Sequence, residues 1–293
     1  MQQIRSALSL FNGISGLHLA LDKAQINVEQ VYYSEIDKFA NKVTEQQYPN
    51  DIALGDVTKW REWDIDWSSV DLVSAGFPCQ AWSVAGKQLG DKDERGMLFW
   101  TTLDIIKTVL EHNPKAKFLM ENVKMKKDFE EYITHHTTEA LGYVEKTLIN
   151  SALVSAQNRN RYYWTNFEVT QPEDKGIVLK DVLDVTVNGV FIINQKALSR
   201  YTNENGKVKG FKEVFEKSNC LTASMHKGFG NDGCTVVSSS ANNYRKLTPI
   251  ECERLQTVPD NWTECLSNTQ RYKSLGNGWT IDVIAHILEC AYK

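Results

Sequence analysis

The sequence lacks the segments that carry proteins into or across a membrane. Its N-terminus shows no basic stretch followed by an apolar one, and no apolar run approaches the roughly twenty residues that span a bilayer. Secretion and membrane insertion are therefore not predicted, and we expect the protein in the cytoplasm. Internal repeats, low-complexity segments and polar linkers are absent as well, so no repeat architecture is expected.

The cysteine pattern excludes the common zinc and disulfide frameworks. The six cysteines show no CxxC spacing and no metal-ligand cluster. We predict no bound metal and reduced thiols, of which one is a candidate catalytic nucleophile. The six are Cys79, Cys220, Cys234, Cys252, Cys265 and Cys290.

The composition is that of an ordinary globular protein. With 293 residues, 42% of them hydrophobic, the chain can form one large domain and a smaller one. The net charge of -4 argues mildly against a protein that coats nucleic acid, but residues 184–246 hold nine Lys and Arg against five Asp and Glu. This basic segment is either a solvated face or a binding surface.

A short apolar run leads directly to a cysteine. Asp71 to Ala75 and the Gly76-Phe77-Pro78 that follows predict a buried strand with Cys79 on the loop after it. In an open parallel sheet, ligands bind beyond the carboxyl ends of the strands, so Cys79 is a candidate nucleophile. An inert buried cysteine is the alternative for this stretch taken alone. The polar, glycine-punctuated loop at 84–96 that follows is a candidate lid or a mobile surface loop.

The first strand is followed by a glycine turn and a helix. The turn, Phe11 to Gly16, permits close approach of a ligand, but it does not have the GxGxxG spacing of a dinucleotide site. A ligand with adenosine and no pyrophosphate therefore fits better. Glu35 and Asp56 follow the next two apolar runs, which makes Glu35 a candidate ribose ligand and Asp56 a candidate partner for an adenine amino group. Surface or helix-capping roles are the alternatives.

Regular alternation of strands and helices continues to about residue 183 and predicts a parallel sheet. A further apolar run, 117–123, contains Glu121, the third such run with a carboxylate near its end. Arg159 and Arg161 are spaced to face the same side of an extended segment. Helices are expected at 38–47, 97–112, 128–141 and 281–291. From 184 to 243 short runs alternate with Asn, Gly and Ser, as in a small irregular domain.

The order and separation of six motifs over nearly the whole chain resemble those of the DNA (cytosine-5)-methyltransferases of bacteria and phages. The motifs are Phe11–Gly16, Gly76–Gln80, Glu121–Val123, Gln157–Arg161, Arg245–Pro259 and Gly276-Asn277. The resemblance implies an α/β fold, the Rossmann-like S-adenosylmethionine-dependent methyltransferase fold with a doubly wound, mostly parallel sheet. It also implies a catalytic and cofactor-binding domain at 1–183 plus 245–293, and a small irregular target-recognition domain at 184–244.

The implied reaction is transfer of a methyl group from S-adenosylmethionine to carbon 5 of cytosine in sequence-specific duplex DNA. Cys79 would add to carbon 6, and Glu121 would share a proton with ring nitrogen 3. Arg161 would lie against the cytosine carbonyl and Glu121, with Arg159 helping to shape the pocket. Because carbon 6 is inaccessible in a duplex, the base must flip out.

The resemblance assigns further residues to the cofactor and to DNA. Those implied for the cofactor are Phe11, Gly13, Ser15, Gly16, Glu35, Ile36, Asp56, Val57 and Asn277. Those implied for the flipped nucleotide and the DNA are Gln80, Ser83, Lys87, Arg95, Gln157 and Lys227. Ser15, where the family usually has glycine, and Gly278-Trp279 depart from the family pattern at the methionine end of the cofactor pocket.

The implied partner is double-stranded DNA, with a cognate restriction endonuclease as a further candidate and a monomer as the expected state. No membrane partner is implied. The alternatives are a transfer-RNA cytosine-5 methyltransferase of the same fold, a catalytically silent DNA-binding member, and a generic nucleotide-binding α/β enzyme in which Cys79 is structural.

Overall fold

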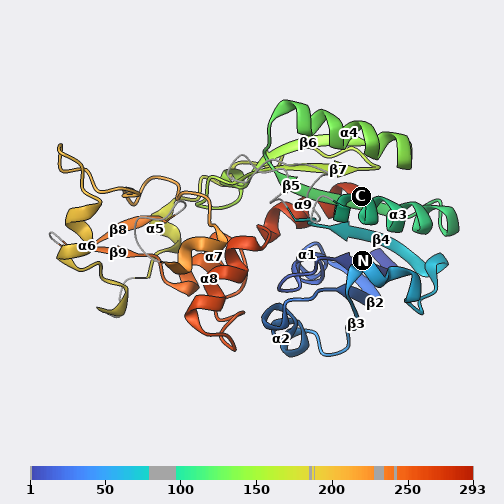
Figure 1. Cartoon of the computed structure of the whole chain (residues 1–293), viewed down its shortest axis with the longest axis horizontal. Helices are drawn as coiled ribbons and strands as arrows, with labels where there is room; N and C mark the ends of the chain where they lie inside the picture. The colour runs from blue at the N-terminus through green and yellow to red at the C-terminus, as the bar shows by residue number, and fades with distance from the viewer. Residues whose placement is uncertain are drawn as a thin grey trace. The chain divides into compact units, whose positions relative to one another are not determined.

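The structure of the protein is a computed structural model that describes residues 2–78, 97–184, 187, 189–227, 234–240 and 243–292. The chain divides into two compact units (Figure 1). Unit 1 comprises 1–149, 160–171 and 284–293, and unit 2 comprises 150–159 and 172–283.

Unit 1 is built on a seven-stranded sheet with the order β3-β2-β1-β4-β5-β7-β6. Strands β1 to β5 pair in parallel, and β7 pairs antiparallel to β5. The strand order reverses direction at β1, the type of position where ligands bind in doubly wound sheets. The strands are β1 (Gln2–Leu10), β2 (Ile26–Ser34), β3 (Ile52–Gly55), β4 (Val70–Ala75), β5 (Lys117–Val123), β6 (Glu145–Asn150) and β7 (Asn160–Thr165).

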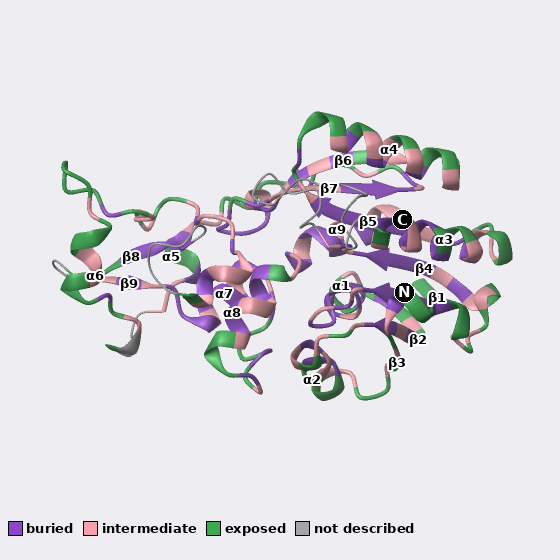
Figure 2. Ribbon diagram, in the orientation of Figure 1, coloured by how far each residue is buried: buried purple, intermediate pink, exposed green. Residues whose placement is uncertain are grey.

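Helices cover both faces of this sheet, which explains the continuous apolar runs of its strands. Leu8, Val73 and Phe118 pack with side chains of α3 in one core cluster. The alternate residues of the same strands, such as Leu72 and Leu119, are fully buried as well. Figure 2 shows β4 and β5 largely in the colour of buried residues. The helices of unit 1 are α1 (Gly16–Lys23), α2 (Lys38–Gln47), α3 (Met97–His112) and α4 (Lys127–Leu141), with most of α9 (Ile281–Tyr292).

The predicted α/β class and mostly parallel sheet are confirmed. The expected bounds of α2 and α3 agree with the structure residue for residue. The run expected at 52–57 ends as a strand at Gly55, because the Asp56 carboxylate accepts the Thr58 amide and starts a 3-10 helix, η1 (Val57–Glu62).

Unit 2 consists of short elements with little regular sheet. They are α5 (Leu179–Val182), α6 (Gln195–Arg200), β8 (Val236–Ser240), β9 (Asn243–Lys246), α7 (Pro249–Leu255), α8 (Asn268–Asn277) and the 3-10 helices η5 (Ser151–Leu153), η6 (Gly189–Phe191) and η7 (Ala223–Lys227). The helix start expected from Thr248 and Pro249 is present, with Thr248 and Glu251 forming a capping box. Arg245 makes two hydrogen bonds to the fully buried Glu251, which links β9 to α7.

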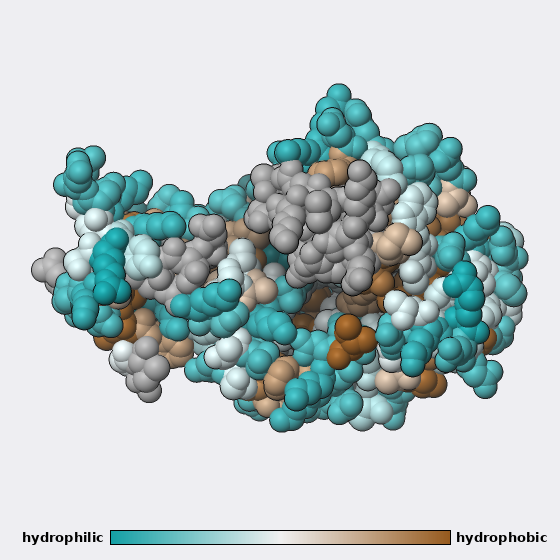
Figure 3. Space-filling view, viewed as in Figure 1, coloured by the Kyte–Doolittle hydropathy of each residue, from teal (hydrophilic) through white to brown (hydrophobic). Residues whose placement is uncertain are grey.

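The described part of the face shown in Figure 3 is mainly polar. Hydrophilic side chains cover most of the described face shown in Figure 3, with apolar side chains in small groups. No helix in the described parts of the chain combines the length and the apolarity needed to cross a bilayer.

Candidate active site

An acidic and a basic side chain meet at the carboxyl end of β5. Val123 of β5 lies opposite Arg161 of β7, and Glu121 points to the same face because side chains alternate along a strand. Arg161 Nε lies 2.9 Å from Glu121 Oε1, and the two side chains are only 13% and 10% exposed. The structure therefore brings together two of the predicted catalytic residues in a nearly buried ion pair.

The segment that precedes Cys79 is attached to this same strand. Asn122 Nδ2 donates to the carbonyl oxygen of Phe77 at 3.2 Å, and both residues are almost completely buried. Phe77 also packs against Phe99 of α3, with ring centroids 5.5 Å apart. The chain is thus fixed beside the Glu121 strand two residues before the predicted nucleophile. Cys79 itself lies outside the described residues, as do Gln80, Ser83, Lys87 and Arg95.

The turn between β1 and α1 has an unusual backbone. Phe11, Gly13 and Ser15 have φ values of 56°, 58° and 66°, a region in which residues other than glycine are strained by about 1 kcal/mol or more. The Ser15 hydroxyl donates to Thr44 Oγ1 at 2.8 Å. Ser15 therefore occupies a conformation suited to the glycine usual in the family, and its hydroxyl ties the turn to α2.

Glu35 is held against the turn by three main-chain amides. Its Oε2 accepts from Gly13 N at 2.9 Å, and its Oε1 accepts from the amides of Ile36 and Asp37 at 2.8 Å each. A carboxylate has about four acceptor positions, so it retains capacity for a further donor. Ile36 is 77% exposed, which is unusual for a large apolar side chain beside a buried turn.

The two residues after β3 differ in their surroundings. Thr58 donates its amide and its hydroxyl to Asp56, and these hydrogen bonds hold the pKa of Asp56 below its usual range. Val57 is 6% exposed and belongs to the core of unit 1. The Asp56 carboxylate is thus charged and accessible, whereas most of Val57 is already covered by protein.

Arg159 and Gln157 lie inside unit 2 and bind its main chain. The Arg159 guanidinium donates to the carbonyl oxygens of Leu221 at 3.0 Å and Gly278 at 2.8 Å. Gln157 accepts from Leu221 N at 2.7 Å and donates to Leu255 O at 3.1 Å. Both residues are nearly or completely buried, so these contacts support a positioning role.

The remaining predicted residues of unit 2 are more accessible. Asn277 is the last residue of α8 and is exposed, and Lys227 is the exposed last residue of η7. Gly276, beside Asn277, cannot be replaced freely, because a Cβ there would lie 2.2 Å from the main-chain carbon of Thr222. Asn277 thus follows a glycine that packs directly against the backbone of η7 and its preceding residue.

Comparison with known proteins supplies the deciding observation. Residues 6–293 match the family described as C-5 cytosine-specific DNA methylase. The chain belongs to this family. It is a DNA cytosine-5 methyltransferase, as the resemblance of its motifs predicts.

Relatives of the methylase include several bacterial type II methyltransferases. M1.ScrFI of Lactococcus lactis subsp. cremoris is 35% identical over 96% of this chain and 76% of its own length. M.NlaX of Neisseria lactamica is 32% identical over 96% of this chain and 94% of its own. M.HhaI of Haemophilus parahaemolyticus is 30% identical over 96% and 92%, respectively.

Solved structures support the same fold for the methylase. The Entamoeba histolytica methyltransferase EhMeth gives a TM-score of 0.79 at 18% identity, covering 99% of this chain and 98% of that one. A DNMT2 from Spodoptera frugiperda gives 0.73 at 20% identity, covering 99% and 100%.

The structure also draws attention to residues of the methylase that the sequence analysis did not single out. Asn122 lay within a quoted motif, but its bond to Phe77 becomes evident only from the fold. Lys124 and Lys126 follow β5 and are exposed, while Met125 between them is 6% exposed and packs in the core. The Lys-Met-Lys alternation was a visible signal of two cations directed away from the core, next to the candidate catalytic glutamate.

Proposed function

We propose that this methylase transfers a methyl group to carbon 5 of a flipped-out cytosine in sequence-specific duplex DNA, through a covalent adduct between Cys79 and carbon 6. The observation that carries the proposal is the nearly buried Glu121–Arg161 ion pair on the strand to which Asn122 ties the segment before Cys79. This arrangement supports a carboxyl group and a nucleophile acting on opposite atoms of one ring.

Cys79 and Glu121 have complementary tasks in the reaction. The Cys79 thiolate forms a bond to carbon 6, and the electron pair of the carbon 5–carbon 6 double bond becomes available at carbon 5. Glu121 shares a proton with ring nitrogen 3, which neutralises the negative charge that the addition places on the ring. After carbon 5 has taken the methyl group, its proton leaves to solvent and the Cys79 sulfur departs, restoring the double bond.

Arg161 prepares Glu121 for this task. A guanidinium beside a carboxylate fixes the rotamer of that carboxylate through a charge-assisted hydrogen bond. The nearly buried setting excludes most water, so a proton placed between Glu121 and the ring is not readily lost to solvent. We assign the cytosine carbonyl to Arg161 as well, while Arg159 and Gln157 act through the main-chain segments that they hold.

The turn in unit 1 fits S-adenosylmethionine. That molecule supplies a methyl group on a positively charged sulfur. The oriented Glu35 carboxylate suits a ribose hydroxyl, and the exposed Ile36 side chain suits an adenine face. A Cβ at Gly13 would meet no atom within 4 Å, so there is open space at Gly13 for part of the cofactor.

The other predicted cofactor residues complete this assignment. Asp56 would accept from the adenine amino group, and Val57 would support the ring from the core. Phe11 and Gly16 would flank the methionine part, and the resemblance assigns Asn277 to the cofactor as well.

Exposed cations are available for the DNA backbone. Lys124 and Lys126 are oriented outward by the buried Met125, and we assign them to phosphates next to the flipped nucleotide. The basic segment at 184–244, with Lys227 as a candidate contact, is assigned to target recognition. Because relatives are named type II methyltransferases, we propose that the sites of this enzyme match those of a restriction endonuclease. We also propose that the enzyme is monomeric.

The proposal is tested by measuring transfer of a labelled methyl group to duplex DNA and to transfer RNA. With the wild-type protein, we expect label in DNA cytosine and no label in RNA. With the Cys79→Ala variant, we expect no label in DNA. Label found exclusively in transfer RNA would establish the alternative substrate. Specific DNA binding without any methyl transfer would indicate a catalytically silent member, and activity in the Cys79→Ala variant would exclude the covalent mechanism.

A further inference from the structure

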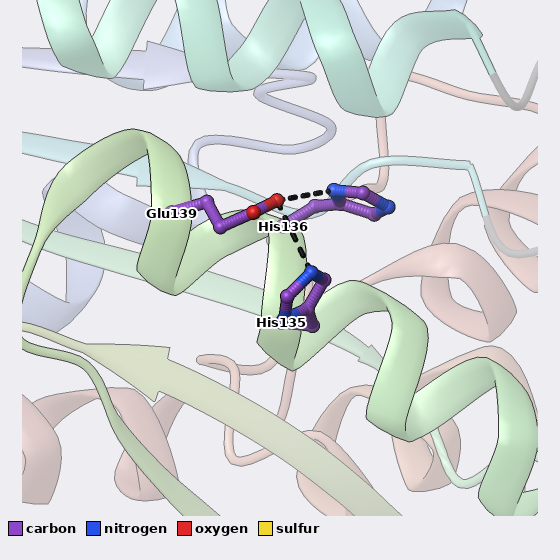
Figure 4. A group of neighbouring side chains, drawn as sticks. All are labelled: His135, His136 and Glu139. Carbon is purple, nitrogen blue, oxygen red and sulfur yellow. Dashed lines mark hydrogen bonds and ion pairs between the residues drawn. The ribbon is translucent and has the colours of Figure 1, made fainter.

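Three side chains with metal-binding atoms lie together on α4 in unit 1. Figure 4 shows the imidazoles of His135 and His136 directed toward the carboxylate of Glu139. His135 Nε2 lies 3.2 Å and His136 Nδ1 lies 3.0 Å from the same oxygen, Glu139 Oε2. All three candidate ligand atoms lie within 4.8 Å of one another.

The helix and its neighbours produce this arrangement. Residues three and four apart lie on one side of a helix, so Glu139 reaches both histidines of the preceding turn. The His136 ring packs against Trp100 of α3 at a centroid distance of 4.9 Å and edge-on to Tyr132 at 4.4 Å. His136 is therefore fixed by aromatic contacts, whereas the side chains of His135 and Glu139 are 64% and 59% exposed and can adjust.

The distances are close to those that a metal ion requires. Zinc binds histidine nitrogen and carboxylate oxygen at about 2.0–2.2 Å, so neighbouring ligand atoms in a tetrahedral site are about 3.3–3.5 Å apart. The two nitrogen–oxygen separations of 3.2 and 3.0 Å are slightly shorter than the distance expected between two ligand atoms of a tetrahedral site. The exposed side chains of His135 and Glu139 have room to adjust their positions around an ion.

We propose that His135, His136 and Glu139 form a binding site for a divalent transition metal ion, with water completing the coordination. Two imidazole nitrogens and one carboxylate oxygen are a donor set suited to Zn²⁺ and Ni²⁺ and poorly suited to Mg²⁺ or Ca²⁺. The ion would bridge one turn of α4 and replace the two contacts to Glu139 Oε2. The proposal does not depend on the methyl-transfer reaction.

The test is calorimetric titration of the untagged, full-length protein with Ni²⁺ at neutral pH. The variants His135→Ala and Glu139→Gln change exposed side chains, so the fold is preserved, and His112→Ala removes an exposed histidine from the end of α3 as the matched control. We expect one Ni²⁺ per chain in the wild type and in His112→Ala, and at least about tenfold weaker binding in each of the other two variants.

The same titration with Mg²⁺ is expected to show no binding at this site. Equal Ni²⁺ affinity in the wild type and in both site variants would overturn the proposal. An affinity of the wild type no greater than that of the double variant His135→Ala/Glu139→Gln would overturn it as well.

Discussion

Replacing Glu121 by Gln separates a catalytic from a structural role of the ion pair. Breaking a fully buried ion pair costs about 3–5 kcal/mol of unfolding free energy. Here the side chains keep 10% and 13% exposure, and the Gln amide oxygen can still accept from Arg161, so we expect a loss of about 1–2 kcal/mol. If Glu121 shares its proton with the base, the rate of methyl transfer falls by about 10²- to 10⁴-fold.

The assay measures single-turnover methyl transfer to duplex DNA at a temperature where circular dichroism shows both proteins to be folded. Asp71→Asn is the matched control, because it weakens the ion pair between Asp71 and Arg5, whose closest atoms are 2.6 Å apart in the same unit. We expect this control to lose stability and keep its rate per folded molecule. A Glu121→Gln rate within threefold of wild type would refute the assigned role.

Three further predictions follow from the geometry. Lys124→Ala should reduce the slope of log DNA affinity against log salt concentration by about 1. Lys115→Ala, in the loop before β5, should leave this slope unchanged. Equal slopes in both variants would contradict the assignment of Lys124 to a phosphate. Glu35→Gln should raise KM for S-adenosylmethionine about tenfold or more with a smaller change in kcat, as measured by initial rates, because a charge-assisted hydrogen bond to the ribose is lost; an unchanged KM would remove Glu35 from the cofactor site. Burial raises the pKa of the Cys252 thiol well above its usual range, so iodoacetamide at pH 8 should not label it in the folded protein, and labelling seen by mass spectrometry before unfolding would disprove its burial.

The sheet was predictable because its signals are local. Apolar runs such as 117–123 and the breaker-free stretch at 97–112 specify a strand and a helix without reference to distant residues. In the structure, β3 ends two residues before the end of the expected run, because the Asp56 side chain accepts the Thr58 amide. Hydrophobic periodicity does not encode such a contact.

The site was predictable in its residue types and less so in its contacts. Glu121 and Arg161 were paired through the motifs, and their ion pair depends on the antiparallel register of β5 and β7. That Arg159 donates to the carbonyls of Leu221 and Gly278 depends on contacts across more than 60 and 100 positions of the chain, respectively, which no local pattern contains. Glu35 was singled out because it follows the apolar run after the glycine turn, but its bond to Gly13 required the folded turn.

The most direct test of the central claim is bisulfite sequencing of DNA from cells that express the protein. Methylation of carbon 5 protects cytosine from conversion, so the account predicts unconverted cytosines at one position of a short recurring sequence, and none in cells that express Cys79→Ala. Complete conversion in both cultures, with folded protein present in each, would contradict the account.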